Sequence, residues 1–506
     1  MTYVSGNNAR RFFDLGCLLL LGAMVIWFTH EMIWGGKVPF FRDLGPYFYP
    51  MRFSLAESMR VGELPLWDRH AAMGFPLLAN FQSGVFYPPH LFFLIFPFFG
   101  AIRALYVFHY LVAATGAYCL CRRWGYSPTL AVIGGVLFTF GGFTVSSTNL
   151  LNHFQTAVWL PWVCLSGRVY LQAKSAKALF FFVLIVLFQF FAGSPELFAL
   201  GQGLFLLEVM RCKKVGGDVT WHRTARLLLT AYGLVLGLGM VQLLPTLELF
   251  SLSGRSESLS FARVAAWSLH PLAVINFFFL DKEVDHSSLD GFRLFFSEEV
   301  PWVVSLYMGA IALPAILLWL FNSSLKERLV VLPLITFTLV LAMGHHTPIF
   351  ALLYQYFPLV KLFRFPEKFL FLTFALVWYV VLRGLFNLLQ TKDPYPRGFH
   401  FCLLAPGFLW LGLFLLLSIK RGALVDFINQ AGITTPRVDQ ILENSAAILI
   451  YLERQISLAI GIFLISLFWK KGKLGSGLSK SLLIGLVFFD LGSAHRSYQF
   501  QLDPAF

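Results

Sequence analysis

The sequence predicts an all-α polytopic integral membrane protein with about thirteen transmembrane helices. Of its 506 residues, 58% are hydrophobic and 13% are charged, whereas a soluble domain carries about 25% charged residues. The mean hydropathy is +0.71, and the 57 Phe residues suit helix contacts and membrane interfaces. One aqueous core cannot bury this much apolar surface, so we expect the chain to be surrounded by lipid.

Apolar stretches of about 20 residues, the length that crosses a bilayer, recur along the chain. The first runs from residue 12 to 34, behind Arg10 and Arg11. It is longer than the core of a signal peptide, so we expect a retained helix with a cytoplasmic N-terminus. The predicted spans are centred near Leu20, Ala113, Gly135, Pro161, Leu184, Leu204, Val235, Leu313, Ile335, Phe374, Leu411, Phe463 and Val487.

Basic residues cluster in short connections after even-numbered spans, which indicates that these connections are cytoplasmic. They are residues 122–123, 168–177, 211–226, 326–328, 392–397 and 470–480. An odd number of spans then predicts an extracytoplasmic C-terminus. This clustering accounts for the net charge of +13, and without a basic nucleic-acid module we expect no nucleic-acid partner. The six Cys residues form no CxxC pair and are expected to pack as small apolar groups.

Long outer segments divide the predicted chain into five parts. The first outer loop is expected to contain two interfacial helices, at 53–60 and 90–99, the second of which is too short to cross a bilayer. A further outer stretch, 420–445, is expected to be a polar connector. The parts are the N-terminus with the first helix (1–34), the first outer loop (35–105), a helix bundle (106–250), the second outer loop (251–300) and the C-terminal helices (301–506) with an outer loop at 344–368.

Polar residues concentrate in these outer loops, and Asp43 opens the first of them. A carboxylate near a bilayer is costly without a use. An ionised Asp can take the proton of an acceptor hydroxyl, and Arg364 has the fork geometry that binds a leaving phosphate. We therefore predict Asp43 as a catalytic base and Arg364 as a phosphate ligand. The alternatives are that Asp43 caps a helix or pairs with Arg42, and that Arg364 is an interfacial anchor.

Other outer residues are candidates for substrate binding. Glu196 lies at a turn after Ser194 and Pro195, where it either shapes the turn or reaches the site. Glu298 and Glu299 either bind substrate or are solvated charges before a span. His346, beside His345, either contributes to the site or bonds the backbone at a helix end. We find no P-loop, HExxH or GxSxG motif and predict no metal ligands.

Four motifs, in order along nearly the whole chain, resemble the YfhO family of bacterial membrane proteins, within the GT-C glycosyltransferase superfamily. They are Asp43 with Trp67-Asp68, Gly74-Phe75-Pro76, Ala79-Asn80, Gln82 and Phe86-Tyr87-Pro88; Ala192-Gly193-Ser194-Pro195-Glu196; Glu298-Glu299 with Tyr307-Met308-Gly309; and Gly344-His345-His346-Thr347-Pro348 with Phe363-Arg364-Phe365-Pro366.

The resemblance implies a GT-C-like fold in the bacterial cytoplasmic membrane and inverting transfer from a polyprenyl-phosphate-linked sugar outside the membrane. The acceptor would be an envelope glycan, lipid or protein. The family's catalytic carboxylate maps to Asp43. On this basis Trp67, Asn80, Gln82 and Tyr87 join the residues predicted to bind substrate.

The chain departs from the pattern in two ways. Many GT-C enzymes carry a second acidic residue beside the first, but Leu44 follows Asp43 here, so a divalent cation is compatible with the sequence and not required by it. YfhO-like chains also often continue into an outer soluble domain. Two other functions therefore stand as alternatives: a transporter or flippase of lipid-linked precursors, and a non-catalytic assembly factor of the envelope.

Overall fold

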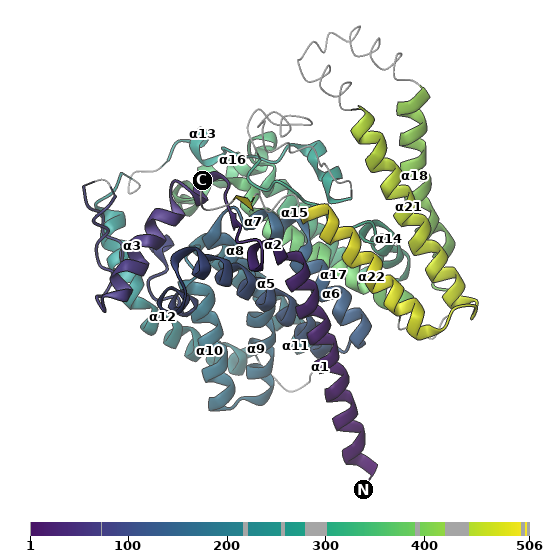
Figure 1. Cartoon of the computed structure of the whole chain (residues 1–506), viewed down its shortest axis with the longest axis horizontal. Coiled ribbons are helices and arrows are strands. Elements are labelled where there is room, and N and C mark those ends of the chain that lie inside the picture. The colour runs from purple at the N-terminus through teal and green to yellow at the C-terminus, as the bar shows by residue number, and fades with distance from the viewer. Residues whose placement is uncertain are drawn as a thin grey trace.

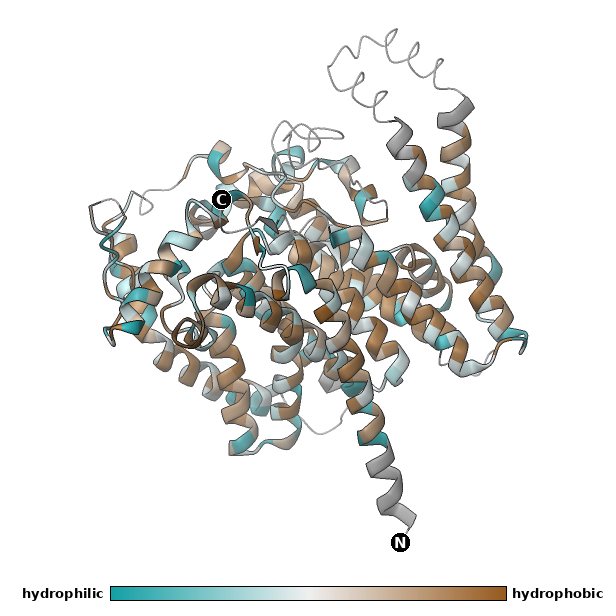
Figure 2. Cartoon of the chain, viewed as in Figure 1, coloured by the Kyte–Doolittle hydropathy of each residue, from teal (hydrophilic) through white to brown (hydrophobic). Residues whose placement is uncertain are grey.

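The computed structural model of the chain describes residues 2–71, 73–215, 221–254, 259–278, 301–389, 395–419, 445–496 and 501–502. Within these ranges, seven helices are long and apolar enough to cross a membrane. Helix surfaces are mostly hydrophobic, while hydrophilic residues gather towards helix ends and connections (Figure 2). The seven are α1 (Thr2–Phe28), α5 (Phe98–Arg123), α6 (Pro128–Phe140) continued by α7 (Gly142–Ser147), α12 (Trp221–Ser251), α17 (Leu370–Leu389), α21 (Ser445–Lys470) and α22 (Ser476–His495).

Further helices complete the bundle, and each predicted span centre lies within a helix. The multi-pass, helical character of the chain is thus confirmed, while the count of about thirteen spans stays a prediction. The spans expected around Pro161 and Leu313 agree least, because their helices begin only at Leu160 and Ala312. These helices are α9 (Leu160–Ala173), α10 (Ala176–Phe191), α11 (Pro195–Val215), α14 (Ala312–Asn322), α15 (Leu325–Ala342) and α18 (Phe399–Ile419).

The first outer loop is built from short elements. Helix α3 contains the predicted helix at 53–60, but the one at 90–99 is interrupted at Phe96 and Pro97, because proline disfavours helical backbone in the residue before it. Helix α5 already begins at Phe98, so the loop ends before residue 105. Its elements are α2 (His30–Ile33), β1 (Val38–Pro39), η1 (Arg42–Leu44), α3 (Phe48–Arg60), η2 (Phe81–Ser83), η3 (Pro88–Leu91) and α4 (Phe92–Ile95).

The later outer segments also consist of short helices. Figure 1 shows α13 and α16 at the same end of the molecule as the C-terminus and away from the N-terminus. Most of the predicted connector at 420–445 lies outside the described residues; its last residue begins α21. The elements are α13 (Phe261–Val264), η4 (Pro271–Phe277), η6 (Gly344–His346), α16 (Pro348–Tyr356), η7 (Pro358–Leu362) and η8 (Pro366–Phe369).

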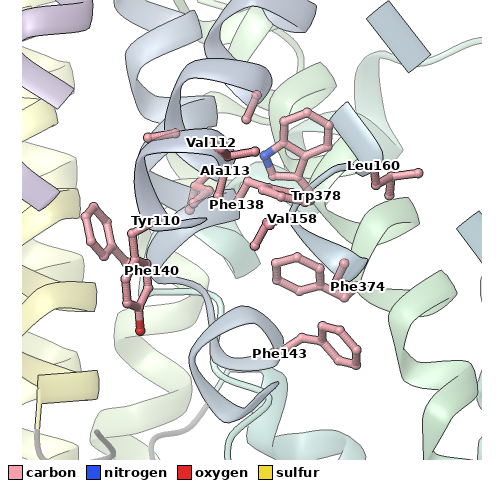
Figure 3. Close-up of a cluster of buried hydrophobic side chains, with 14 of the residues drawn as sticks. Tyr110, Val112, Ala113, Phe138, Phe140, Phe143, Val158, Leu160, Phe374 and Trp378 are labelled. Carbon is pink, nitrogen blue, oxygen red and sulfur yellow. The ribbon is translucent and has the colours of Figure 1, made fainter. Parts of the chain in front are cut away.

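The core lies where α5, α6 and α17 meet, and aromatic rings fill it (Figure 3). Phe138 packs against Phe374 and Trp378, with ring centroids 5.7 and 5.4 Å apart. Elsewhere small residues allow closer approach: a Cβ added to Gly384 of α17 would lie 1.8 Å from the carbonyl oxygen of Ala315 in α14. Close backbone packing of this kind stabilises helix contacts in lipid, where the hydrophobic effect is absent.

The helix that begins as α6 is broken twice inside the protein. It stops at Gly141, resumes as α7, and stops again before α8 (Leu151–Ala157). A Cβ at Gly142 would lie 2.6 Å from the backbone of the 305–307 segment, and the Gly142 N–H donates to the Tyr307 carbonyl at 2.8 Å. The buried polar residues of this broken segment are Thr144, Ser146, Ser147, Thr148, Asn149, Asn152, His153, Gln155 and Thr156.

The C-terminal helices join the rest of the molecule through buried polar contacts. Helices α18 and α21 lie side by side and project from the main body, and α22 returns towards α1 (Figure 1). Asp490 of α22 accepts hydrogen bonds from the Tyr307 hydroxyl at 2.9 Å and the Ala310 N–H at 2.7 Å, and it lies 3.2 Å from Arg454. These bonds fix α21 and α22 to the segment that faces the broken helix.

A small sheet lies beyond the end of α1 that is opposite the N-terminus. Strand β1 pairs antiparallel with β2 (Gln501–Leu502), with Val38 opposite Leu502. Nearby, Arg496 lies 2.8 Å from Glu31, which also lies 3.0 Å from Lys37. The last described residues are therefore attached to the first outer loop.

Candidate functional site

Asp43 lies on η1 with its side chain exposed. Within the described ranges its carboxylate accepts no hydrogen bond and forms no ion pair, and only its carbonyl oxygen is used, by the Tyr47 N–H at 3.0 Å. The N-terminus of α3 has no side-chain cap, so Asp43 does not act as one. This carboxylate is available to a ligand.

Arg42, beside Asp43, points into the protein. Its guanidinium donates to the carbonyl oxygen of Trp302 at 3.2 Å and to that of Pro301. Among the described residues it forms no ion pair with Asp43, which was the alternative to a catalytic role. Burial lowers the pKa of Arg42 to about 10, against the opposing charges of Glu367 and Asp43. Arg42 therefore stays a cation at neutral pH.

The segment 364–368 brings charges and a ring to the same place. The Phe365 ring centroid lies 4.7 Å from the Arg364 guanidinium and 5.3 Å from the Lys368 ammonium. The Trp267 ring lies 4.3 Å from the Phe365 ring and 5.5 Å from the Arg42 guanidinium. Aromatic faces attract cations in such arrangements.

Backbone strain concentrates at these residues. Within the described ranges five residues other than glycine have positive φ, and three of them, Arg42 (53°), Trp267 (53°) and Phe365 (74°), belong to this contact group. Such conformations cost about 1–3 kcal/mol each and often occur at functional sites. The fold holds the three residues in place at an energetic cost.

Glu196 lies in the first turn of α11 and reaches the same region. Its Oε1 lies 2.7 Å from the Lys368 Nζ, with 20% and 10% of the two side chains exposed. The preceding Gly193, at φ +101°, sits so close to Gln82 that a Cβ would meet its backbone at 3.3 Å. The Glu196 side chain thus forms an ion pair, while the tight turn before it depends on Gly193.

Two further residues complete the group. Glu367 accepts a hydrogen bond from the Val303 N–H at 2.9 Å, which fixes the segment after Trp302. His153 of α8 presents its ring to Trp302, with centroids 5.0 Å apart. We call this group the outer cluster: Arg42, Asp43, His153, Glu196, Trp267, Trp302, Arg364, Phe365, Glu367 and Lys368.

The contacts connect the segments that carry three predicted site residues: Asp43 follows Arg42, Arg364 precedes Phe365, and Glu196 pairs with Lys368. Arg364 is exposed, so both a phosphate ligand and an interfacial anchor remain compatible with its position. Gln82 adjoins the cluster through its backbone, whose carbonyl accepts a hydrogen bond from the buried Arg52 at 3.0 Å. Glu298 and Glu299 lie outside the described residues.

Two other residues predicted to bind substrate, Asn80 and Trp67, make structural contacts within the first outer loop. The Asn80 side chain caps η2 by accepting from the Gln82 N–H at 3.1 Å, and it donates to the Tyr47 hydroxyl at 3.0 Å. The half-exposed Trp67 packs on Gly74, where a Cβ would lie 2.4 Å from the indole nitrogen.

Tyr87 is buried, and its hydroxyl accepts from the Trp159 N–H at 2.7 Å and lies 2.5 Å from His109. The Tyr87 hydroxyl thus forms its hydrogen bonds with other residues of the protein. His346 packs on His345 and His270, at ring centroid distances of 4.1 and 5.3 Å. Burial and these two neighbours lower the pKa of His346, which favours a neutral ring.

His153, Trp267 and Trp302 were not among the predicted site residues. The signal for His153 was the run of polar residues between 144 and 156 in an otherwise apolar region. For the two Trp residues the sequence offers no comparable signal, since indole rings are common at membrane interfaces.

Within the part of the chain that the structure describes, no group of three or more His, Cys, Asp or Glu residues could hold a metal ion. The chain matches no family model, and comparison with curated proteins and with solved structures gives no match. Membership of the YfhO family therefore remains a hypothesis that rests on the motifs.

Proposed function

We propose that the protein is a membrane glycosyltransferase that acts outside the bacterial cytoplasmic membrane. It would transfer a sugar from a polyprenyl-phosphate donor to an envelope glycan, lipid or protein. The main support is the exposed, unpartnered carboxylate of Asp43, which is next in the chain to the half-buried cation Arg42 and belongs to a cluster that combines cationic groups with aromatic rings.

In this reaction the Asp43 carboxylate takes the proton of the acceptor hydroxyl, and the oxygen of that hydroxyl attacks the anomeric carbon of the donor sugar. The bond from that carbon to the phosphate oxygen breaks, and the polyprenyl phosphate leaves with the electron pair. Attack opposite the leaving group inverts the anomeric configuration. Phosphate is already a good leaving group, so the reaction needs a cation rather than a strong acid, and Arg364 and Lys368 supply positive charge.

The membrane orientation belongs to this proposal. Because β2 pairs with β1, just after α1, the C-terminal strand lies beyond the end of α1 that is opposite the N-terminus. If α1 spans the membrane, this supports termini on opposite sides of it; that the N-terminus is the cytoplasmic one is proposed from the basic connections. Reporter fusions to each terminus that give activity on the same side would contradict it.

One observation favours the second candidate, a transporter or flippase of lipid-linked precursors. Transporters bind substrate at interrupted helices with polar residues in the membrane, and α6, α7 and α8 form such an interrupted, polar segment. The two candidates differ in whether the carboxylate of Asp43 is needed, because transport does not require a base at that position.

Mass spectrometry of extracted envelope glycans and glycolipids distinguishes them. The strains are wild type, a deletion, and the deletion complemented with Asp43→Asn or with the control Glu63→Gln, which changes another exposed acid of the same loop. The enzyme predicts that one glycosylated species disappears in the deletion and with Asp43→Asn but persists with Glu63→Gln. If Asp43→Asn restores the species at equal expression, the catalytic role is wrong and transport or assembly becomes the better account.

A further inference from the structure

Two nitrogen atoms of the outer cluster are buried without a hydrogen-bond partner: Nε2 of His153 and Nε1 of Trp267. His153 as a whole is only 6% exposed. A buried polar atom without a partner costs about 1–3 kcal/mol, and native proteins contain few of them. The described residues contain sixteen such atoms; these two both belong to the outer cluster, where a bound ligand would satisfy them.

The protonation of His153 follows from its neighbour. The Asn152 amide nitrogen donates to the Gly193 carbonyl at 3.0 Å, so the amide oxygen faces His153 Nδ1 at 2.8 Å. Nδ1 must then carry the hydrogen, and in the neutral ring Nε2 is an acceptor. The indole Nε1–H of Trp267 can only donate. These two buried atoms thus offer one acceptor and one donor.

Both groups are held against the same backbone. The Glu367 N–H donates to the Trp267 carbonyl at 3.3 Å, while the Glu367 carboxylate holds the Val303 N–H at 2.9 Å. Trp302, next to Val303, contacts the His153 ring. Glu367 therefore connects Trp267, whose indole N–H is the free donor, with the segment 302–303, which contacts the His153 ring.

The free pair fits a hydroxyl-bearing ligand better than an anion. A phosphate has only acceptor oxygens at neutral pH and would be repelled by the lone pair of His153 Nε2, whereas a hydroxyl both donates and accepts. We infer that His153 accepts from, and Trp267 donates to, hydroxyl groups of the donor sugar, an assignment that rests on the proposed function.

Binding of short-chain donors to the purified full-length protein tests this assignment. The probes are short polyprenyl phosphates that carry glucose, galactose, mannose or N-acetylglucosamine, and the same polyprenyl phosphate without sugar. The measured quantity is the ratio of the Kd of the bare lipid to that of the best sugar-bearing lipid. The variants are His153→Phe and Trp267→Phe, each of which removes one free polar group.

Gln155→Leu is the matched control, because Gln155 lies two residues from His153, on the opposite face of α8, and its buried amide atoms also lack partners. We expect each Phe variant to lower the Kd ratio about tenfold, the value of one hydrogen bond, and the control to leave it unchanged. Thermal unfolding checks that each variant folds, and if His153→Phe does not, Trp267→Phe decides the result.

The outcomes separate the two proposals. If the wild type binds neither bare nor sugar-bearing lipid phosphate, the proposed function fails. If it prefers a sugar-bearing lipid and both Phe variants keep the full preference, the function survives and the assignment of His153 and Trp267 is wrong. Equal loss in Gln155→Leu, or no preference for sugar in the wild type, also overturns the assignment.

Discussion

Replacing Glu196 by Gln should destabilise the protein because it leaves Lys368 as a buried cation without its carboxylate. At a separation of 2.7 Å, an effective dielectric constant of about 20 gives roughly 6 kcal/mol of attraction, much of it offset by the desolvation of both charges. Breaking a buried pair costs about 3–5 kcal/mol. Because a fifth of the Glu196 side chain is exposed, we expect the lower end, about 3 kcal/mol.

Reversible unfolding in mixed micelles measures this loss, and a double-mutant cycle isolates the pair. The single changes are Glu196→Gln and Lys368→Met; in their combination no unpaired charge remains, so most of the stability should return. The control is Glu63→Gln, which breaks the largely exposed pair with Arg69 at 3.6 Å and should have no measurable effect. Additive effects of the two single changes would refute the reasoning, because they would show that the charges do not interact.

Three other changes have defined outcomes. Gly142→Ala should destabilise the protein by about 1–3 kcal/mol through overpacking, because its Cβ would lie 2.6 Å from facing backbone; Gly233→Ala, in the interior of α12 with open space around it, should instead stabilise by about 0.5–1 kcal/mol in the same unfolding assay. Asp490→Ala should lower the unfolding temperature and make the 450–496 region more accessible to protease, since it removes the acceptor of Tyr307 and Ala310; a wild-type protease pattern would contradict this. The pKa of Glu31 is lowered, first by its hydrogen bond from Lys37. Its contribution to folding stability is therefore present above the ordinary Glu pKa and is lost as pH falls through the lowered value. Glu31→Gln should destabilise the protein at pH 7, and the difference in unfolding free energy from wild type should vanish in acid.

The sequence predicted the helices well because lipid imposes a simple rule. A span needs about 20 apolar residues, and every predicted centre, from Leu20 to Val487, lies in a helix. The rule fails where helices are interrupted: around Pro161 the chain reads as continuous apolar sequence, but α8 ends at Ala157 and α9 begins at Leu160. There protein rather than lipid surrounds the backbone, so irregular backbone is tolerated.

The candidate site was harder to predict because its residues come from segments far apart in the chain. Asp43, Glu196 and Arg364 were identified by residue type and by side of the membrane. The partner of Glu196 was not, since the pairing of Lys368 with it depends on how α11 packs on η8. His153 was missed because its role follows from a hydrogen bond to its neighbour Asn152, which periodicity cannot indicate.

The pairing of β1 with β2 has a consequence for biosynthesis. A ribosome makes residues 38–39 several hundred residues before their partners at 501–502, and chains fold progressively from the N-terminus during synthesis. The loop that carries Asp43 must therefore wait, with its strand unpaired, until the last helix has been inserted. Nascent chains released before that point should contain most helices but lack the β1–β2 pairing, so the first outer loop would reach its final structure only late in assembly.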